Sequence, residues 1–115
     1  MTLTDLLEKK CVADVTALSA AEVTPLLALL DNWHLAEGKV VRAFGCKNYY
    51  DTLSFINAIA YVIHAENHHP ELVVTYNRCI VKFDTHSVDD GRGGLSINDF
   101  VCAAKIDAIF QQSFS

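Results

Sequence analysis

The stretch ENHHPELVVTY, residues 66–76, marks the point where the chain changes from helix to strand, and it decides the predicted fold. An apolar run with helical spacing precedes it. Pro70 disfavours helical geometry at the residue before it, so the helix should end near His68. The run Leu72 to Tyr76 is rich in β-branched residues and predicts a strand. The adjacent histidines His68 and His69 therefore stand at an element boundary and should point in different directions.

The helix that leads into this stretch is predicted to have Asn48 as its N-cap, because Asn48 stands three residues before Asp51. Its apolar side chains form two stripes offset by about 100°, which together cover more of the helix than the core of a small domain needs. The stripes are Tyr49, Leu53, Ile56, Ala60 and Ile63 on one line, and Phe55, Ile59 and Val62 on the other. We expect the longer stripe to face the core and the shorter one to contact a partner subunit, which predicts a homo-oligomer, either a dimer or a tetramer.

A second strand is predicted after the stretch, because residues 79–86 alternate strictly between two faces and Asn77-Arg78 suits a turn. One face carries Cys79, Val81, Phe83 and Thr85, and the other carries Ile80, Lys82, Asp84 and His86. His86 should therefore lie on the polar face at the end of this strand. The following segment DDGRGG, residues 89–94, predicts a flexible loop.

Two further helices are predicted from their N-terminal caps. Ser19 and Glu22 form a capping box ahead of an apolar run, although Thr24 could instead be the N-cap, which would place Pro25 at the first helical position. The last helix should follow a cap made by Ser96 and Asp99, and it carries Phe100, Val101, Ala104, Ile106 and Phe110. We assign Asp99 a structural role at this helix start, where its charge complements the helix dipole, and no part in proton transfer.

The order of the predicted elements is helix, two strands, helix, two strands, helix. The first strand pair is the loosely alternating runs Trp33 to Ala36 and Val40 to Phe44, joined at Gly38, which can adopt the positive φ of a tight hairpin. The predicted fold class is α+β, a four-stranded antiparallel sheet with three helices packed on one face. Residues 19–115 should form this single domain, and residues 1–18, which show no clear period, a poorly ordered N-terminal arm.

Composition excludes several classes of protein. The chain has 115 residues, of which 51% are hydrophobic and 20% charged, as expected for one compact domain. The net charge of −5 and the scattered lysines and arginines argue against direct nucleic-acid binding. The longest apolar run, residues 53–63, is interrupted by polar residues and is too short to span a membrane, and no signal sequence is evident. We therefore expect a cytoplasmic protein that does not associate with membranes.

The cysteines and histidines suggest no metal motif. Cys11, Cys46, Cys79 and Cys102 include no CxxC pair, which predicts free thiols in a reducing compartment. His64 and His68 have the spacing of the helical zinc motif HExxH, but Ala65 stands where that motif has its glutamate, and no third ligand is specified. Solvated histidines at a helix end are the simpler interpretation. The glycines of residues 89–94 likewise match no phosphate-binding motif.

Acid/base chemistry without a metal is the remaining hypothesis, because the unperturbed pKa of imidazole, about 6.5, suits proton transfer near neutral pH. If the helix end at His68 meets the strand end at His86, the two imidazoles could flank a small ligand, with His69 beside them. The alternative from composition is that these histidines are scattered over the surface.

The segment HAENHHPELVVTY, residues 64–76, followed by His86 and by GLSINDF, residues 94–100, resembles the pterin-4a-carbinolamine dehydratase family. Animal members of this family are also called the dimerisation cofactor of a homeodomain transcription factor. The similarity extends from the helix after Ser19 to the last helix, which is nearly the whole chain apart from the N-terminal arm.

The resemblance implies the dehydration of a 4a-hydroxytetrahydropterin, released by aromatic amino acid hydroxylases, to the quinonoid dihydropterin, with no cofactor or metal. The implied partners are the pterin substrate and, functionally, such a hydroxylase. The residues that the resemblance places in or near the pterin site are His68, His69, Pro70, Thr85, His86 and Trp33. We expect His68 and His86 to carry the proton transfers and His69 to place the ring. The alternative is a protein-binding dimerisation scaffold on the same fold.

Overall fold

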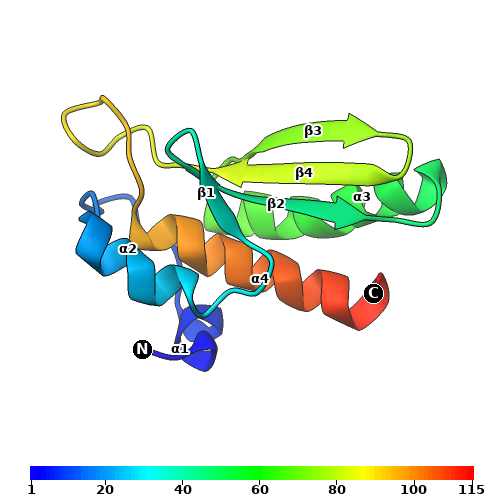
Figure 1. Cartoon of the computed structure of the whole chain (residues 1–115), viewed down its shortest axis with the longest axis horizontal. Helices are drawn as coiled ribbons and strands as arrows, with labels where there is room; N and C mark the ends of the chain where they lie inside the picture. The colour runs from blue at the N-terminus through cyan, green and yellow to red at the C-terminus, as the bar shows by residue number, and fades with distance from the viewer.

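The computed structural model describes all residues, 1–115, and shows a four-stranded antiparallel sheet above a layer of helices (Figure 1). The strands are β1 (His34–Ala36), β2 (Lys39–Gly45), β3 (Glu71–Thr75) and β4 (Arg78–Phe83), in the order β1-β2-β4-β3. The helices are α1 (Leu3–Glu8), α2 (Ala20–Leu27), α3 (Tyr49–Glu66) and α4 (Ile97–Ser113). The predicted α+β class and the four-stranded antiparallel sheet are confirmed.

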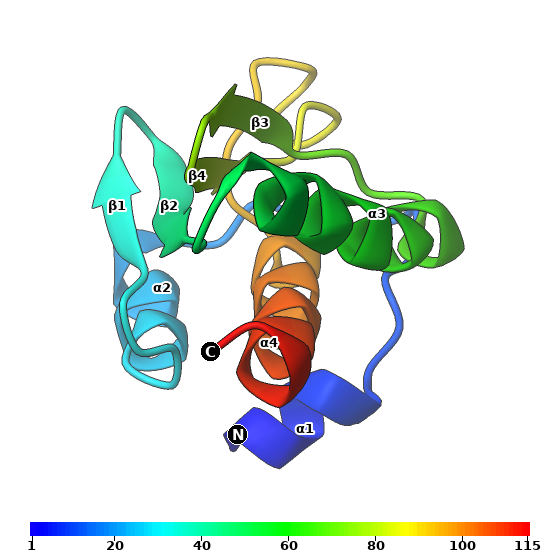
Figure 2. The same cartoon turned by 90° about the vertical axis from the view of Figure 1, so that its right-hand side faces the viewer.

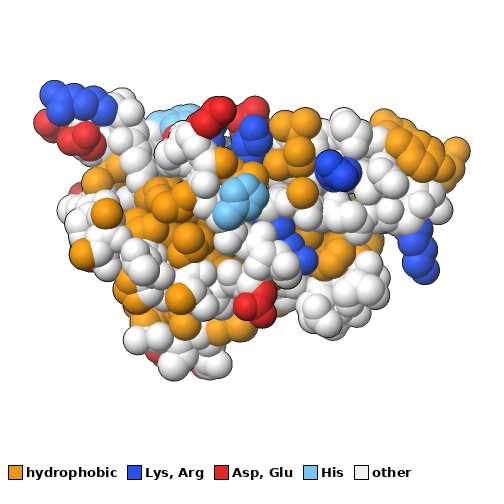
Figure 3. Space-filling model, in the orientation of Figure 1, with side chains coloured by type: hydrophobic (Ala, Val, Ile, Leu, Met, Phe, Trp, Pro, Cys, Tyr) orange, Lys and Arg blue, Asp and Glu red, His pale blue; other side chains and the backbone are white.

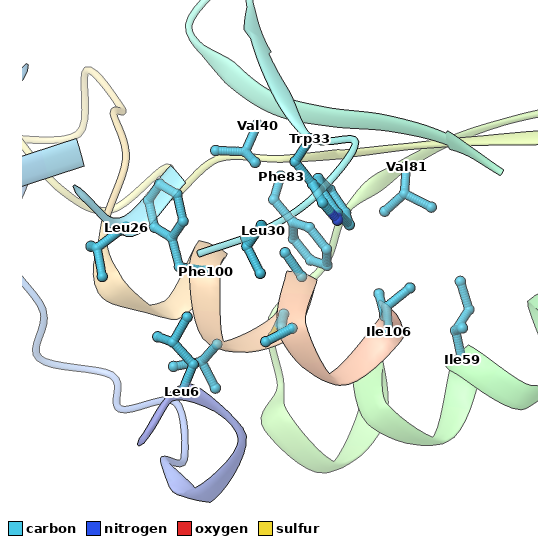
Figure 4. Close-up of a cluster of buried hydrophobic side chains, with 14 of the residues drawn as sticks. Leu6, Leu26, Leu30, Trp33, Val40, Ile59, Val81, Phe83, Phe100 and Ile106 are labelled. Carbon is cyan, nitrogen blue, oxygen red and sulfur yellow. The ribbon is translucent and has the colours of Figure 1, made fainter. Parts of the chain in front are cut away.

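The helical layer is built around α4. Figure 2 shows α4 running beneath the sheet between α2 and α3, with α1 on the side of α4 away from the sheet. Large apolar side chains from the sheet and from the helices meet in the space between them (Figure 4). Those labelled in Figure 4 are Leu6, Leu26, Leu30, Trp33, Val40, Ile59, Val81, Phe83, Phe100 and Ile106, and all are buried. None of the helices is long and apolar enough to cross a membrane.

Two hairpins build the sheet, as predicted. Glu37 and Gly38 link β1 to β2, with φ angles of 53° and 79°, so both residues of this turn lie in the left-handed region. Tyr76 and Asn77 link β3 to β4, one residue earlier than the turn predicted at Asn77-Arg78. The hairpins join through an antiparallel pairing of β2 with β4, in which Val40 lies opposite Phe83. The central strand β4 therefore leads to His86, and its neighbour β3, at the edge of the sheet, begins just after His68 and His69.

The helix α3 begins after the predicted N-cap Asn48, whose side chain accepts a hydrogen bond from the Asp51 amide. It ends at Glu66, because Asn67 adopts the left-handed conformation with φ 51° and ψ 45°. The helix thus ends two residues before His68, the end that was predicted from Pro70. This left-handed turn redirects the chain, so both following histidines lie outside the helix.

The assignment of the two stripes of α3 was wrong. Phe55, Ile59 and Val62 are buried in the core, whereas Tyr49 and Leu53 of the longer stripe are exposed. The phenyl ring of Phe55 contacts three other aromatic rings, those of Phe44, Phe110 and Phe114, with centroid distances of 4.8 to 5.6 Å. The shorter stripe faces the core because it carries the side chain that fills the space between the sheet and α4.

The helices α1 and α2 both begin with a capping box. Ser19 caps α2 with Glu22, so the alternative start at Thr24 is excluded, and Pro25 lies inside the short helix. Residues 1–18 contain a helix that the sequence pattern did not predict, α1, in which Leu6 is fully buried in the core. The fold therefore has four helices and not three.

Candidate active site

His68 is held in one orientation by a carboxylate and an aromatic ring. Its Nε2 lies 2.6 Å from Oδ1 of Asp99, which belongs to the first turn of α4. Its ring stacks on Phe83 of β4, with a centroid distance of 5.6 Å and an interplanar angle of 5°. The side chain is only 11% exposed. Two elements, β4 and α4, therefore fix the position of this imidazole just after the end of α3.

Asp99 is fully buried and its second oxygen is also hydrogen-bonded. Oδ2 accepts from the hydroxyl of Thr85 at 2.9 Å and from the backbone N–H of Ser96 at 2.9 Å. Because the Thr85 hydroxyl hydrogen is used in this way, the hydroxyl of Ser96 donates to Thr85 across 2.7 Å. A bridge between Thr85 and Gly94 closes the intervening loop and brings Thr85 to the start of α4.

The predicted capping role of Asp99 is confirmed, but its bond to His68 was missed. The two residues are 31 positions apart, and no spacing rule relates a helix end to the start of a later helix. The capping box by itself also explained an acidic residue at this position, so no second partner was expected. The signal that could have raised the question is the resemblance, because the segment GLSINDF contributes to it.

The Asp99 carboxylate determines which ring nitrogen of His68 is available. An ionised carboxylate only accepts hydrogen bonds, so Nε2 carries a hydrogen, and in the neutral ring Nδ1 keeps its lone pair. Nδ1 has no protein partner, and it is not buried, since the only buried side-chain nitrogen or oxygen without a partner is Nε of Arg42. Nδ1 of His68 is therefore free to form a hydrogen bond with a small molecule.

A polar cavity of about 260 Å³ lies against His68. No hydrophobic residue lines it; the lining residues are Asn67, His68, His69, Asp84, Thr85, His86 and Ser87. The imidazole of His86 is 84% exposed, and its Nε2 lies 3.2 Å from Oδ1 of Asp84, with which it forms an ion pair when protonated. Three imidazoles and a carboxylate thus surround one small space, as the hypothesis of acid/base chemistry requires.

A second cavity, of about 520 Å³, adjoins the first at His68. The two share Asn67, His68, Thr85 and Ser87. One wall of the second cavity comes from the N-terminal segment, through Cys11, Val12, Ala13 and Val15. The segment between α1 and α2 is therefore close to the histidines, although the sequence suggested no role for it.

Two of the predicted site residues lie apart from these cavities. Trp33 is 6% exposed and lines neither cavity; its Nε1 donates to Oδ1 of Asp107 at 2.8 Å, and its ring lies in the core against Phe83. Trp33 therefore does not border the cavities beside His68, and its expected place in or near the pterin site stays a prediction. Pro70 follows His69 directly but lines neither cavity. Asp84 and Ser87 are lining residues that the sequence reading did not select.

Metal ligands do not gather in this region or elsewhere. The structure has no group of three or more His, Cys, Asp or Glu side chains placed to hold a metal ion. His64, one helical turn before His68, is exposed and lines neither cavity, and the Nε2 atom of His68 is engaged by Asp99.

The fold is an α+β domain with a histidine-lined polar cavity, and one of its imidazoles is paired with a buried carboxylate. This arrangement belongs to the class of proteins with a site suited to acid/base chemistry on a small molecule. Residues 16–109 match the model of the pterin 4 alpha carbinolamine dehydratase family. The chain belongs to this family, as its resemblance predicted.

Individual relatives agree with this membership. A Bdellovibrio bacteriovorus protein, provisionally named pterin-4-alpha-carbinolamine dehydratase, is 51% identical over 115 residues, which is 100% of this chain and 96% of that protein. A Nitrosomonas europaea protein with the same provisional name is 47% identical over 95% of this chain and 94% of its own length. A crystal structure described as a transcriptional coactivator/pterin dehydratase from Brucella melitensis has a TM-score of 0.73 and 30% identity, and covers 82% of this chain and 98% of its own.

Proposed function

We propose that this protein dehydrates a 4a-hydroxytetrahydropterin to the quinonoid dihydropterin, and so recycles the pterin that an aromatic amino acid hydroxylase releases. Membership of the family supports the reaction. The observation that carries the proposal for this chain is the imidazole of His68, fixed by Asp99 and bordering the same polar cavity as His86. A functional partnership with such a hydroxylase follows from the source of the substrate.

The reaction is an elimination of water across the C4a–N5 bond of the pterin. The C4a–O bond breaks and the hydroxyl leaves as water after it receives a proton. N5 loses its proton, and the electron pair left behind forms the C4a–N5 double bond. The reaction therefore needs one acid and one base on a small ligand, and imidazoles are suited to both roles.

We assign the base to His68 and the acid to His86. The hydrogen bond from Nε2 of His68 to Asp99 leaves Nδ1 as the acceptor for the N5 proton. His86 lines the same polar cavity, with its Nε2 3.2 Å from Oδ1 of Asp84, and takes the remaining role of the group that gives a proton. His69, which also lines the polar cavity, is assigned to placing the ring, and Thr85 acts through its hydrogen bond to Asp99.

The test is to add the purified protein to a phenylalanine hydroxylase assay and to follow the decay of the carbinolamine absorbance. His68→Ala and His86→Ala should each lower kcat by about 10²–10⁴-fold, the usual contribution of a general acid or base. His69→Ala should act mainly on KM. His64→Ala is the matched control, because this exposed imidazole lines neither cavity and should leave both constants unchanged. Near-normal kcat in either of the first two variants would remove that histidine from proton transfer.

A protein-binding role is the second candidate. It is favoured by the structural neighbour described as a transcriptional coactivator/pterin dehydratase. A chain that acts only as a scaffold would keep its function in the His68→Ala and His86→Ala variants, because neither change alters the helices through which a partner would bind. If the wild-type protein had no dehydratase activity but bound a protein partner, this second role would be favoured.

A further inference from the structure

Two thiols meet where the N-terminal segment crosses α4. Sγ of Cys11 lies 3.4 Å from Sγ of Cys102, although the residues are 91 positions apart. Cys102 is fully buried, whereas Cys11 is half-buried and lines the 520 Å³ cavity beside His68. A disulfide bond is about 2 Å long, so a closure of roughly 1.4 Å would join the two sulfurs. No sequence motif predicts this pair, because the two cysteines lack the short spacing of a redox motif.

The backbone around Cys11 is held in place by side chains from two helices. The N–H of Cys11 donates to Oε1 of Glu66, at the end of α3, across 2.8 Å. The side chain of Asn98, at the start of α4, bonds the backbone of Val12 twice, accepting from its N–H at 3.2 Å and donating to its carbonyl at 2.8 Å. Cys102 lies one helical turn beyond Asn98. The hydrogen bonds of residues 11 and 12 to Glu66 and Asn98 therefore hold the sulfur of Cys11 next to that of Cys102.

We propose that Cys11 and Cys102 form an oxidisable pair that a peroxide converts into an intramolecular disulfide. The thiolate of Cys11, after losing its proton to solvent, attacks one oxygen of the peroxide, which gives a sulfenic acid and releases the other oxygen as water or alcohol. The sulfur of Cys102 then attacks the Cys11 sulfur, and the proton of Cys102 leaves with the hydroxyl as water. The two thiols lose two electrons and the peroxide is reduced.

The two sulfurs have different environments, and this sets their order of reaction. The hydrogen bond with Cys11, together with burial, raises the pKa of the Cys102 thiol far above its ordinary value. Cys102 therefore stays protonated and has no access to solvent, whereas Cys11 can be reached from the cavity. Cys11 is the thiol that meets the peroxide, and Cys102 is the one that resolves the sulfenic acid. An added dithiol reverses the bond by thiol–disulfide exchange.

The bond would tie to α4 a segment that lies almost wholly outside the residues matched by the family model, which begin at residue 16. This segment walls the cavity next to His68. The inference does not depend on the proposed dehydration, because its chemistry involves the two thiols alone. It predicts a covalent state of this chain that no part of the reaction requires.

The experiment is to treat the fully reduced protein with hydrogen peroxide, block the remaining thiols and digest without reduction. Trypsin should place the four cysteines on separate peptides, residues 11–39, 43–47, 79–82 and 93–105. We expect a linked pair of peptides 11–39 and 93–105, the loss of two of the four thiols, and the return of both on adding dithiothreitol. The amides of Cys11 and Val12 should exchange their hydrogens more slowly in the oxidised protein.

Two serine variants serve as controls. Cys11→Ser should abolish the linked peptides and leave Cys102 as a free thiol, while Cys46→Ser should form the link as the wild type does. Irreversible oxidation of Cys11 without the linked peptides would overturn the proposal, as would a link between peptides 43–47 and 79–82 in their place. Because the mapping is done on the wild-type chain, its result stands even if a variant folds poorly.

Discussion

At the scale of single residues, Asp99 serves two purposes with its two oxygens. Oδ2 closes the capping box of α4 and accepts from Thr85, while Oδ1 holds His68. A carboxylate suits this position because every neighbouring group donates to it. The role first assigned to Asp99, that of a helix cap alone, is therefore incomplete, and its replacement should affect chemistry as well as stability.

We predict that Asp99→Asn lowers kcat by about 10²–10⁴-fold, because the amide reverses the tautomer of His68. The Asn oxygen must face the two donors, Thr85 and the Ser96 amide, which turns its NH₂ group toward Nε2 of His68. That nitrogen then becomes the acceptor, and the hydrogen moves to Nδ1, where the base needs a lone pair. Carbinolamine decay measures the rate, and ¹⁵N chemical shifts of the ring report the tautomer.

The matched control for this change is Asp5→Asn. Asp5 occupies the same third position of the capping box of α1, but no histidine contacts it. It should leave kcat and the tautomer of His68 unchanged. If Asp99→Asn shifted the melting temperature alone, with kcat and the ¹⁵N shifts intact, the carboxylate would be a cap and nothing more.

At the scale of the elements, the reversal of the two stripes on α3 shows which decisions the sequence leaves open. Both stripes are apolar and continuous, so periodicity identifies the helix but not the face it buries. The choice is made by the ring cluster around Phe55, to which β2 contributes Phe44 and α4 contributes Phe110. These contacts join positions far apart in the sequence, and no local pattern reports them.

We predict that Phe55→Ala lowers the free energy of unfolding by about 3–5 kcal/mol, the usual cost of removing a buried aromatic side chain. Tyr61→Ala on the same helix should change it by less than about 0.5 kcal/mol, because Tyr61 is exposed and outside the core. Urea unfolding followed by circular dichroism measures both. Equal costs for the two variants would contradict the assignment of the buried face.

Short sequence signals correctly predicted the helix starts and one of the turns, because these features depend on neighbouring residues. The caps Ser19, Asn48 and Ser96 and the turn at Gly38 are short-range features, and each marks the element boundary that the sequence indicated. The resemblance likewise indicated four residues that line the polar cavity, His68, His69, Thr85 and His86. What could not be predicted depends on long-range contacts: the docking of α1, the bond from Asp99 to His68, and the approach of Cys11 to Cys102.

At the scale of the whole molecule, many apolar side chains remain exposed after the core has formed, and two of the surfaces that carry them bear on assembly. One is the outer side of α3, where Tyr49 and Leu53 are exposed. The other is a groove of about 590 Å³ beside α2 and β1, whose lining residues include Leu27 and the exposed Leu35. Hydrophobic side chains gather on this part of the surface in Figure 3. Exposed apolar surface of this kind favours association, so the proposal of a homo-oligomer keeps its physical basis even though the predicted stripe faces the core.

We predict that the protein is a homo-oligomer, a dimer or a tetramer, at micromolar concentration and that the outer side of α3 forms the contact. Leu53→Glu should shift the assembly to a smaller species, because it places a charge in an apolar contact and leaves the core stripe intact. Leu35→Glu, which puts the same charge in the groove beside α2, should leave the assembly unchanged. Light scattering coupled to size-exclusion chromatography measures both masses. A wild-type monomer would remove the prediction, and dissociation by Leu35→Glu alone would move the interface from α3 to the groove.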